Sequence, residues 1–290
     1  MTAQIRVAAA PISWGVCEVP GWGRVLGAPV VLGEMAGLGI TATELGPPGY
    51  LPRDPAELKA VLAGHRLELV GGFLAVALHR NPDAAIAEAE ESAALFAACG
   101  AGTLVLAAAT GLDGYDERPD LTAAEWSALV RTAAEIRDVA AKNGLQTVLH
   151  PHVGTQVETE AEVERFLADS DLLLCLDTGH LLIGGTDPVA LAQRHPARIG
   201  HLHLKDVRGD LAAKVRAGEL PYAEAVGQGL YVPLGQGDVD LEAMLRAVAD
   251  AGYDGWYVLE QDTALGEDSP ADRPGQDVAA SLAYLRKITG

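Results

Sequence analysis

The sequence predicts an α/β fold, a closed (β/α)8 barrel of the TIM type, formed by a single domain over residues 1–290. Eight short apolar runs alternate along the chain with longer alanine- and leucine-rich segments of helical pattern. Runs such as Thr103–Ala109 and Leu172–Leu176 lack polar alternation, which is typical of parallel strands buried on both faces. No Gly-x-Gly-x-x-Gly follows the first run, so an open dinucleotide-binding sheet is disfavoured.

The expected strands are the eight apolar runs. In chain order they are Ile5–Trp14, Thr41–Leu45, Leu67–Ala75, Thr103–Ala108, Leu145–His150, Leu172–Asp177, Arg198–Leu204 and Gly255–Glu260. Eight strand–helix units in a chain of this length favour a closed barrel over an open sheet.

Helix starts are expected where a capping side chain directly precedes a proline, because the pair satisfies an orphan N–H and pre-sets the first helical φ. This pattern occurs at Asp54–Pro55, Asn81–Pro82, Asp187–Pro188 and Ser269–Pro270. Thr122 and Glu125 have the spacing of a capping box, and Gly144 is expected to end that helix in the left-handed conformation.

Two connections are longer than the others, Val16–Pro29 after the first strand and Val207–Gly237 after the seventh. In a TIM barrel both loops lie at the C-terminal face of the strands, where active sites are built. The sequence leaves open whether 207–237 is a mobile lid or an interface arm.

The charge and the composition exclude several classes of partner. Lys and Arg number 21 against 40 Asp and Glu, and the resulting net charge of −19 disfavours nucleic acid and anionic membranes. Cys17, Cys99 and Cys175 lack metal-type spacing, so a disulfide or zinc-finger framework is not expected. Since there is no secretory pattern and no apolar stretch of about 20 residues, we expect a soluble, cytoplasmic protein.

Side chains suited to chemistry gather where the predicted strands end. They are Trp14, Glu44, His150, His152, Asp177, His180, His201, His203, Lys205, Asp206 and Glu260. A strand end tolerates an ionisable group because it opens onto solvent, whereas the middle of a buried strand does not. The C-terminal ends of barrel strands meet at one mouth, so we expect these side chains to converge there.

The histidines and carboxylates of this set favour a metal site. Asp177, His203, Glu260 and either His150 or His152 could supply four ligands from four strands. Such a set suits Mn²⁺, Co²⁺, Fe²⁺ or Zn²⁺ and argues against a Ca²⁺ cage of oxygens. Taken singly, each residue has a simpler explanation, since Asp177 could cap the following turn and a histidine at a strand end is more often structural. Their coincidence at four strand ends favours one shared site.

Other candidates are weaker. Trp14 and Trp22 could stack on a sugar ring, although core packing explains Trp14 nearly as well. Cys17 is expected to be a plain small side chain, because no histidine is close to it in the sequence. Gly71 and Gly72 favour close packing or a bulge over a phosphate cradle.

Three motifs resemble a known superfamily: Asp177-Thr-Gly-His180, His201-Leu-His-Leu-Lys-Asp206 and Gly252-Tyr-Asp-Gly-Trp-Tyr-Val-Leu-Glu260. They are similar to the xylose-isomerase-like TIM barrels, which include sugar-phosphate isomerases, ketose 3-epimerases and endonuclease IV. The chain also resembles the inosose dehydratase branch at Pro11-Ile-Ser-Trp-Gly15, Thr43-Glu-Leu-Gly-Pro47, Tyr50-Leu-Pro52, His150-Pro-His-Val-Gly-Thr155 and Tyr231–Asp240. The resemblance runs nearly end to end.

The resemblance implies that Asp177, His203 and Glu260 bind a divalent metal. The superfamily's fourth ligand is a Glu at the end of strand five, where this chain has His150. Two carboxylates with two neutral imidazoles balance a divalent cation, so we infer a more electrophilic metal than a third carboxylate would give. The change also removes one of two opposed carboxylate bases, which favours elimination with one base and one acid over epimerisation.

The resemblance therefore implies a metal-dependent lyase that dehydrates a cyclic polyol ketone, namely 2-keto-myo-inositol (scyllo-inosose). Mn²⁺ or Co²⁺ is the expected metal, with Zn²⁺, Fe²⁺ and Mg²⁺ as alternatives, and glutathione is an assisting thiol by resemblance only. Glu44, His180 and Lys205 are open candidates for the general base. The expected substrate-binding residues are Trp14, His152, His180, Lys205 and Asp206.

Three other functions compete with this one. A sugar isomerase or ketose epimerase would use the same barrel and metal. An abasic-site endonuclease is opposed by the net charge of −19, and a catalytically inactive sugar-binding barrel has no need of ligand-type residues at one mouth. We expect a small-molecule substrate, no nucleic-acid or membrane partner, and a homo-oligomer by resemblance.

Overall fold

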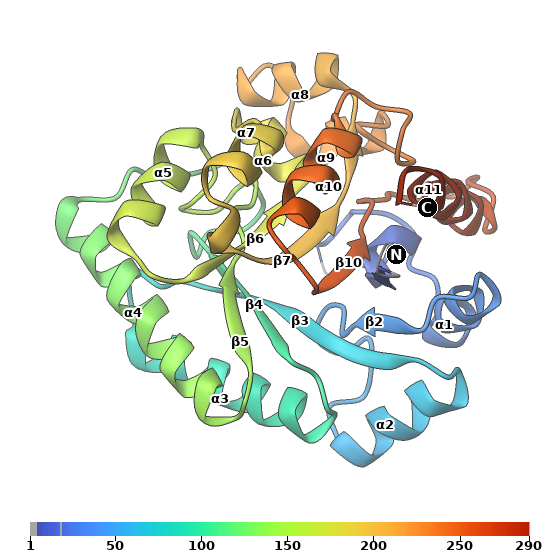
Figure 1. Cartoon of the computed structure of the whole chain (residues 1–290), viewed down its shortest axis with the longest axis horizontal. Helices are drawn as coiled ribbons and strands as arrows, with labels where there is room; N and C mark the ends of the chain where they lie inside the picture. The colour runs from blue at the N-terminus through green and yellow to red at the C-terminus, as the bar shows by residue number, and fades with distance from the viewer. Residues whose placement is uncertain (1–4, 18, 290) are drawn as a thin grey trace.

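The computed structural model describes residues 5–17 and 19–289. Eight parallel strands close into a barrel in the order β1-β10-β7-β6-β5-β4-β3-β2 (Figure 1), which confirms the predicted fold class. The barrel strands are β1 (Arg6–Ala9), β2 (Ala42–Glu44), β3 (Glu68–Val76), β4 (Thr103–Ala108), β5 (Gln146–Leu149), β6 (Leu173–Asp177), β7 (Ile199–Leu204) and β10 (Trp256–Leu259).

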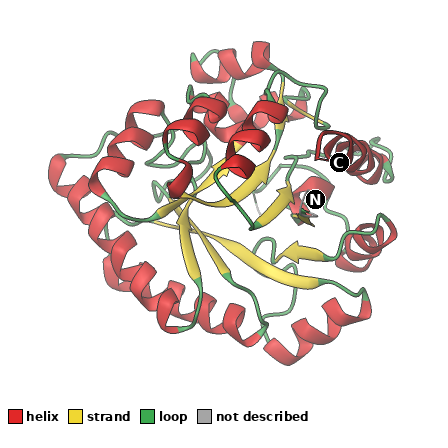
Figure 2. Ribbon diagram, in the orientation of Figure 1, coloured by secondary structure: helices red, strands yellow, loops and turns green. Residues whose placement is uncertain are grey.

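Helices form the outer layer around the strands (Figure 2), so each barrel strand is covered on its outer face. They are α1 (Ala28–Gly37), α2 (Pro55–Gly64), α3 (Pro82–Ala98), α4 (Ala123–Lys142), α5 (Glu160–Asp169), α6 (Thr178–Gly184), α7 (Pro188–Arg194), α8 (Gly209–Arg216), α9 (Tyr222–Gly227), α10 (Leu241–Asp250) and α11 (Arg273–Thr289). The large apolar core lies between these helices and the barrel.

The first strand is shorter than the sequence predicts. It ends at Ala9, and residues Pro11–Trp14 form a 3₁₀ helix instead of continuing the strand. Every strand of a closed barrel pairs with a neighbour on each side. Proline has no N–H to donate to either neighbour, so Pro11 does not continue the strand. The other seven expected strands are confirmed to within three residues at each end.

Most of the predicted helix starts are also confirmed. Asp54 and Asp187 accept hydrogen bonds from the first-turn N–H groups of α2 and α7, and Thr122 forms the expected capping box with Glu125. Gly144, after α4, has the left-handed φ of +78°.

The predicted start at Asn81–Pro82 is confirmed but lacks its cap, and the one predicted at Ser269–Pro270 is wrong. Asn81 precedes α3 but has φ +51°, and its side chain makes no capping hydrogen bond. Ser269 closes a turn by donating its N–H to the carbonyl of Gly266, and α11 begins only at Arg273. At Asn81 the left-handed backbone accompanies the missing cap, and at Ser269 a turn takes the place of the helix start.

The connection after β7 is folded rather than an open loop. Its two ends form the antiparallel strands β8 (Asp206–Val207) and β9 (Tyr231–Val232), and α8 and α9 lie between them. We call residues 207–237 the β7 insertion. Asp206 accepts four backbone N–H groups, from Val207, Gly235, Gly237 and Val239. One carboxylate therefore ties both ends of the insertion to the barrel.

Small apolar side chains fill the barrel interior below the mouth, among them Ala8, Ala42 and Val258. Gly71 and Gly72 pack closely, as predicted: a Cβ at Gly71 would collide with the Thr103 carbonyl oxygen, and one at Gly72 with the Phe96 ring. The pairing of β2 with β3 shifts register here, with Glu44 opposite Gly71. Such an irregularity re-aims a side chain, and Glu44 is buried in the barrel.

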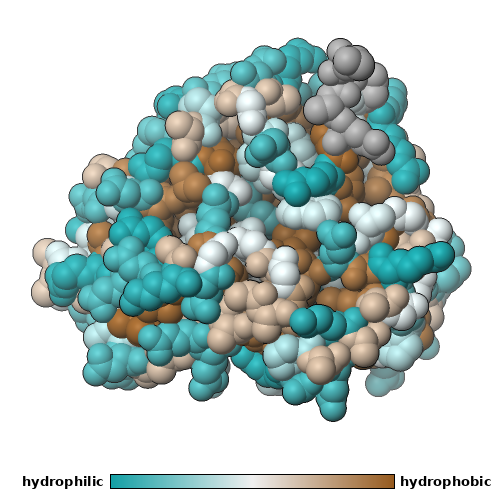
Figure 3. All heavy atoms as spheres, turned by 60° about the horizontal axis from the view of Figure 1, so that its bottom comes forward, coloured by the Kyte–Doolittle hydropathy of each residue, from teal (hydrophilic) through white to brown (hydrophobic). Residues whose placement is uncertain are grey.

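On the face shown in Figure 3, hydrophilic side chains make up much of the protruding surface and hydrophobic ones lie mainly in recesses. In the described part of the chain, no helix has both the length and the apolar character needed to cross a bilayer.

Candidate metal centre

Four of the predicted metal ligands meet at the C-terminal ends of four barrel strands. His150 Nε2 lies 3.2 Å from Asp177 Oδ2, and His203 Nδ1 lies 3.7 Å from the same oxygen. His203 Nδ1 is also 2.5 Å from Glu260 Oε2. Bonds of about 2.0–2.2 Å to one cation would place neighbouring ligand atoms about 3 to 3.5 Å apart. The spacing of His150 and Asp177 suits a shared ion, whereas His203 and Glu260 are closer and would separate on binding one.

Asp177 serves both the helix and the cluster. Its Oδ1 accepts hydrogen bonds from the N–H groups of Gly179 (2.9 Å) and His180 (2.8 Å), and so caps α6. Its Oδ2 faces His150 and His203. The simpler capping explanation and the ligand explanation therefore apply to different oxygens of one carboxylate.

The structure favours His150 over His152 as the fourth ligand. His152 Nδ1 donates to the carbonyl of Val153 at 2.7 Å, and its ring lies 3.7 Å from the ring of His180. Among the described residues, the groups with metal-ligand spacing include His150 together with Asp177 or His203, and none of them includes His152.

Buried atoms without a hydrogen bond support the fit of a cation to this cluster. In the cluster they are His203 Nδ1 and Glu260 Oε2, whereas the orphaned nitrogen of His150 is Nδ1 and not the Nε2 that faces Asp177. These two atoms lie 2.5 Å apart as an ion pair without a well-aligned hydrogen bond, and a cation bound by both would replace that contact. Two imidazoles and two carboxylates form a donor set for Mn²⁺, Co²⁺, Fe²⁺ or Zn²⁺.

Glu44 supports the cluster from inside the barrel. Its Oε1 lies 2.9 Å from His201 Nε2 and 3.0 Å from His203 Nε2, so both histidines point inward, as their alternate spacing predicts. Burial opposes ionisation, but the charge of His203 and hydrogen bonds from both histidines hold the pKa of Glu44 well below its usual range. The carboxylate orients His203 from the ring edge opposite Nδ1.

Lys205 is fully buried beside the cluster. Its Nζ donates to Asp262 and to Glu260 Oε1 (3.2 Å), and lies 3.6 Å from Asp177 Oδ2. Burial opposes the charge, but these three carboxylates raise the pKa of Lys205 well above its ordinary value. Nζ also contacts His180 Nε2 at 3.2 Å, so the ammonium group is held from several sides.

Trp14 and Asp206, two of the residues expected to bind substrate, make structural contacts. Trp14 is fully buried and donates its indole N–H to Glu34 Oε2 at 2.7 Å. Both carboxylate oxygens of Asp206 accept hydrogen bonds from backbone N–H groups at the two ends of the β7 insertion. Neither side chain lines the cavity above the cluster.

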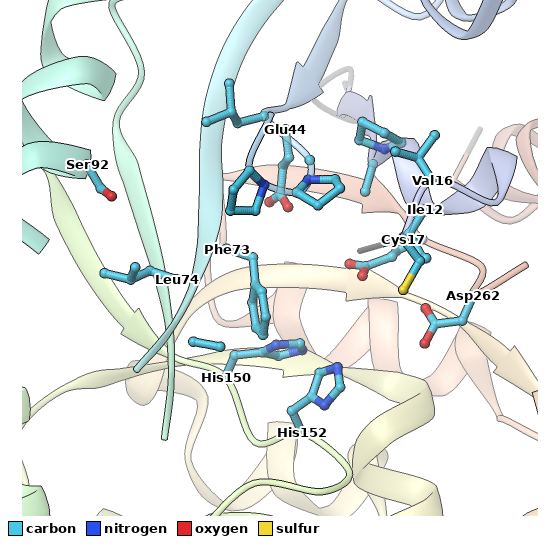
Figure 4. Close-up of a pocket in the computed structure, with 18 of the residues that line it drawn as sticks. Ile12, Val16, Cys17, Glu44, Phe73, Leu74, Ser92, His150, His152 and Asp262 are labelled. Atoms are coloured by element: carbon cyan, nitrogen blue, oxygen red, sulfur yellow. The ribbon is translucent and has the colours of Figure 1, made fainter. Parts of the chain in front are cut away.

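That cavity has a volume of about 220 Å³ and opens at the barrel mouth. In Figure 4, Glu44, Phe73, His150 and His152 point into it from one side, and Cys17 and Asp262 from the other. Its size suits a small molecule. Trp22 is part of the cavity wall, as the sequence suggested. The half-buried Cys17 also lines the cavity, and no histidine is close to it in the sequence.

The sequence analysis missed three residues of this site: Phe73, Asp262 and Tyr222. Tyr222, in the β7 insertion, donates its hydroxyl to Asp262 Oδ2 at 2.5 Å. Asp262 lies two residues beyond Glu260. In an extended chain such residues point to the same side, so this spacing could have predicted that Asp262 belongs to the site. Phe73 sits within an apolar run, and no signal in the sequence separates it from a core residue.

Comparisons with known proteins agree with this architecture. A family model described as "Xylose isomerase-like TIM barrel" matches residues 32–288. The chain belongs to this family. Within it, the chain is similar to the "Rhizopine catabolism protein MocC" of Rhizobium meliloti, with 37% identity over 92% of this chain and 84% of the relative. It is also similar to the "Inosose dehydratase" of Geobacillus thermodenitrificans, with 30% identity over 99% of this chain and 98% of the relative. These matches confirm the predicted resemblance to the inosose dehydratase branch of the family.

The fold itself recurs in solved structures of low sequence identity. A crystal structure of the "IOLI protein with a binding zinc atom" superposes with a TM-score of 0.72 over 98% of both chains, at 16% identity. At that identity the likeness concerns the barrel alone. The cluster of this chain therefore has to be judged from its own side chains.

Proposed function

We propose that this protein is a metal-dependent lyase that removes water from a cyclic polyol ketone, with 2-keto-myo-inositol as the expected substrate. The observation that carries the proposal is the cluster of His150, Asp177, His203 and Glu260 beneath a small cavity, with two imidazoles and two carboxylates at the ends of four strands. The relatives named inosose dehydratase, such as that of Geobacillus thermodenitrificans, support the reaction class.

His150, Asp177, His203 and Glu260 would hold the metal. A divalent cation bound there polarises a ketone oxygen and so makes the neighbouring C–H more acidic. Manganese and cobalt are the metals we propose first, because imidazole and carboxylate ligands accept both.

Two groups of the chain are placed to move protons. Because Nδ1–H of His152 is engaged by the Val153 carbonyl, its Nε2 keeps a lone pair at the cavity, and we assign the base role to it. Lys205 carries an ammonium group held by three carboxylates, two of which, Glu260 and Asp262, line the cavity, and we assign to it the acid role toward the departing hydroxyl.

The roles of the other two candidate bases differ in this proposal. His180 Nε2 accepts a hydrogen bond from the Lys205 ammonium group at 3.2 Å, so it orients Lys205. Glu44 is engaged by His201 and His203, so it positions a metal ligand.

Glutathione as an assisting thiol and a homo-oligomeric assembly stay predictions.

The test is direct. Purified protein with Mn²⁺ or Co²⁺ is incubated with 2-keto-myo-inositol, and the enone product is followed by its absorbance and by the mass of one lost water. We expect product only with the metal, and none from His203→Ala. Absence of product with every metal would contradict the proposal, and interconversion of ketoses without loss of water would favour an isomerase or epimerase.

A further inference from the structure

A chain of buried hydrogen bonds leads from the β7 insertion to the cluster. Tyr222 donates its hydroxyl to Asp262 Oδ2 at 2.5 Å, and the hydroxyl of Tyr231 lies 2.9 Å from that of Tyr222. A phenol has one proton, so the hydrogen bond between the two tyrosines is donated by Tyr231. Asp262 accepts a hydrogen bond from Lys205 Nζ through its other oxygen. The chain therefore runs from Tyr231 through Tyr222 and Asp262 to Lys205, and all four side chains are buried.

Asp262 is held from two sides. Lys205 donates to Oδ1 and Tyr222 donates to Oδ2, so the carboxylate cannot rotate without losing one of the two hydrogen bonds. His180 Nε2 lies 3.8 Å from Oδ2, which is beyond hydrogen-bond distance. Removing the hydroxyl of Tyr222 would therefore free the carboxylate of Asp262 to turn.

Tyr222 is itself fixed by other loops at the barrel mouth. Its backbone N–H donates to Asp116 Oδ1 at 3.0 Å, in the connection between β4 and α4. Its ring lies 5.2 Å from the ring of Tyr115 and 6.2 Å from that of Trp22. Only 1% of Tyr222 is exposed, and it does not line the cavity, so it can influence a ligand there only through another residue.

Lys205 is the group that this chain of hydrogen bonds orients. Besides Asp262, its Nζ contacts Glu260 Oε1 at 3.2 Å and lies 3.6 Å from Asp177 Oδ2. Glu260 and Asp177 are both proposed metal ligands, and a cation bound by them would neutralise their charge. Asp262 would then be the carboxylate that still holds the ammonium group.

We propose that Tyr222 is a positioning residue that fixes the ammonium group of Lys205 through Asp262 and so makes the β7 insertion part of the active site. The proposal rests on the function proposed above, in which Lys205 has the acid role. An acid must lie within hydrogen-bond reach of the departing oxygen, so a displaced ammonium group slows the reaction. Because Tyr222 does not line the cavity, its loss should change kcat and leave KM nearly unchanged.

The test compares three variants that each lose one tyrosine hydroxyl. Tyr222→Phe removes the hydrogen bond to Asp262, and Tyr231→Phe removes only the outer bond of the chain. Tyr253→Phe is the matched control, because that hydroxyl donates to the carbonyl of Trp256 at 2.8 Å, outside the chain of hydrogen bonds.

Three quantities are measured for each protein. The kcat and KM for 2-keto-myo-inositol are determined for the manganese-loaded enzyme, and the manganese content is determined by elemental analysis. Crystal structures of the metal-free wild type and of metal-free Tyr222→Phe then show whether Asp262 and Lys205 have moved.

We expect Tyr222→Phe to bind manganese as before and to lower kcat about 10- to 100-fold, the effect of one hydrogen bond to a charged group. Its KM should stay within about twofold of the wild-type value. Tyr231→Phe should lower kcat less, by about threefold, because it loses a bond between neutral groups. Tyr253→Phe should behave like the wild type, and the Asp262 carboxylate and the Lys205 ammonium group should be displaced in the crystals of Tyr222→Phe.

Several results would overturn the proposal. They are equal kcat values for Tyr222→Phe and Tyr253→Phe, a change confined to KM, loss of manganese from Tyr222→Phe, and crystals of Tyr222→Phe in which Asp262 and Lys205 keep their places. If the wild type dehydrates no ketone with any metal, the proposed lyase activity fails, and the crystals alone decide the inference. Displacement of Asp262 and Lys205 would then uphold the positioning role of Tyr222, and unchanged positions would overturn it.

Discussion

Glu44 Oε1 lies 3.0 Å from His203 Nε2, on the edge of the imidazole opposite to Nδ1. Both side chains are buried. The carboxylate accepts a hydrogen bond from Nε2–H, so Nδ1 is the nitrogen that faces Asp177 and Glu260 and that would bind a metal. A carboxylate that supports a metal-binding histidine in this way sets its tautomer and raises its basicity.

Replacing this carboxylate should weaken metal binding without removing a ligand. We expect Glu44→Gln to raise the dissociation constant for Mn²⁺ about 10- to 100-fold, because a neutral amide supports His203 less well. Competition with a chelating dye measures the effect. Glu68→Gln, an exposed change at the start of β3, is the matched control and should bind like the wild type. Equal affinity in Glu44→Gln would show that Glu44 does not act through His203.

The two histidines of the His150-Pro-His152 segment should behave differently. We expect His150→Ala to lose the metal, because its Nε2 belongs to the cluster, and His152→Ala to keep it and to lose activity by about 100-fold or more. Elemental analysis of each purified variant, with kcat measured at saturating metal, separates the two effects. Loss of metal from His152→Ala with retention in His150→Ala would reverse the assignment.

Asp206 should control the stability of the β7 insertion. In Asp206→Asn one acceptor oxygen becomes a donor that faces the N–H groups of Gly235 and Gly237 or those of Val207 and Val239. We expect the free energy of unfolding to fall by about 1–3 kcal/mol and amide exchange to quicken in residues 207–237.

Hydrogen exchange followed by mass spectrometry locates this effect. Asp210→Asn serves as the control, because that carboxylate pairs with Arg208 at the surface. Quicker exchange spread evenly over the barrel, rather than concentrated in the insertion, would argue against a local tie.

Cys175 should make stability fall at alkaline pH. Burial raises the pKa of this thiol from 9.0 to about 11. Because the folded protein then holds the proton more tightly than the unfolded chain, the contribution is fully present below pH 9 and is lost as the pH rises toward 11.

Urea denaturation of the metal-free protein at pH 8 and pH 10 checks this sign. Relative to Cys175→Ala, the wild type should lose about 1 kcal/mol between the two values. Cys175→Ala creates the same cavity at both pH values, so the effect of the cavity on the free energy of unfolding cancels when pH 8 and pH 10 are compared. A wild-type difference that does not change with pH would mean that the thiol titrates normally in the fold.

The fold could be predicted because its signals are local. Uniform apolar runs gave the strands, and the pairs Asp54–Pro55 and Asp187–Pro188 gave helix starts. The predicted ligands Asp177, His203 and Glu260 each end or follow a strand, so a barrel necessarily brings them to one mouth.

The remaining features depend on contacts between distant parts of the chain. Glu44 looks like a catalytic base until His201 and His203 are placed against it, 157 and 159 residues away. Tyr222 reaches Asp262 only because the β7 insertion folds back over the mouth. The same holds for Trp14, whose partner Glu34 lies on α1. Residue type and spacing along one strand contain none of this information.

The most direct test of the account is a crystal of the manganese-loaded protein measured at the manganese absorption edge. We expect one anomalous peak within about 2.0–2.3 Å of ligand atoms from His150, Asp177, His203 and Glu260, with Glu44 still bound to His203. A peak bound by other side chains, or these four side chains in place with no peak at saturating manganese, would contradict the proposed centre.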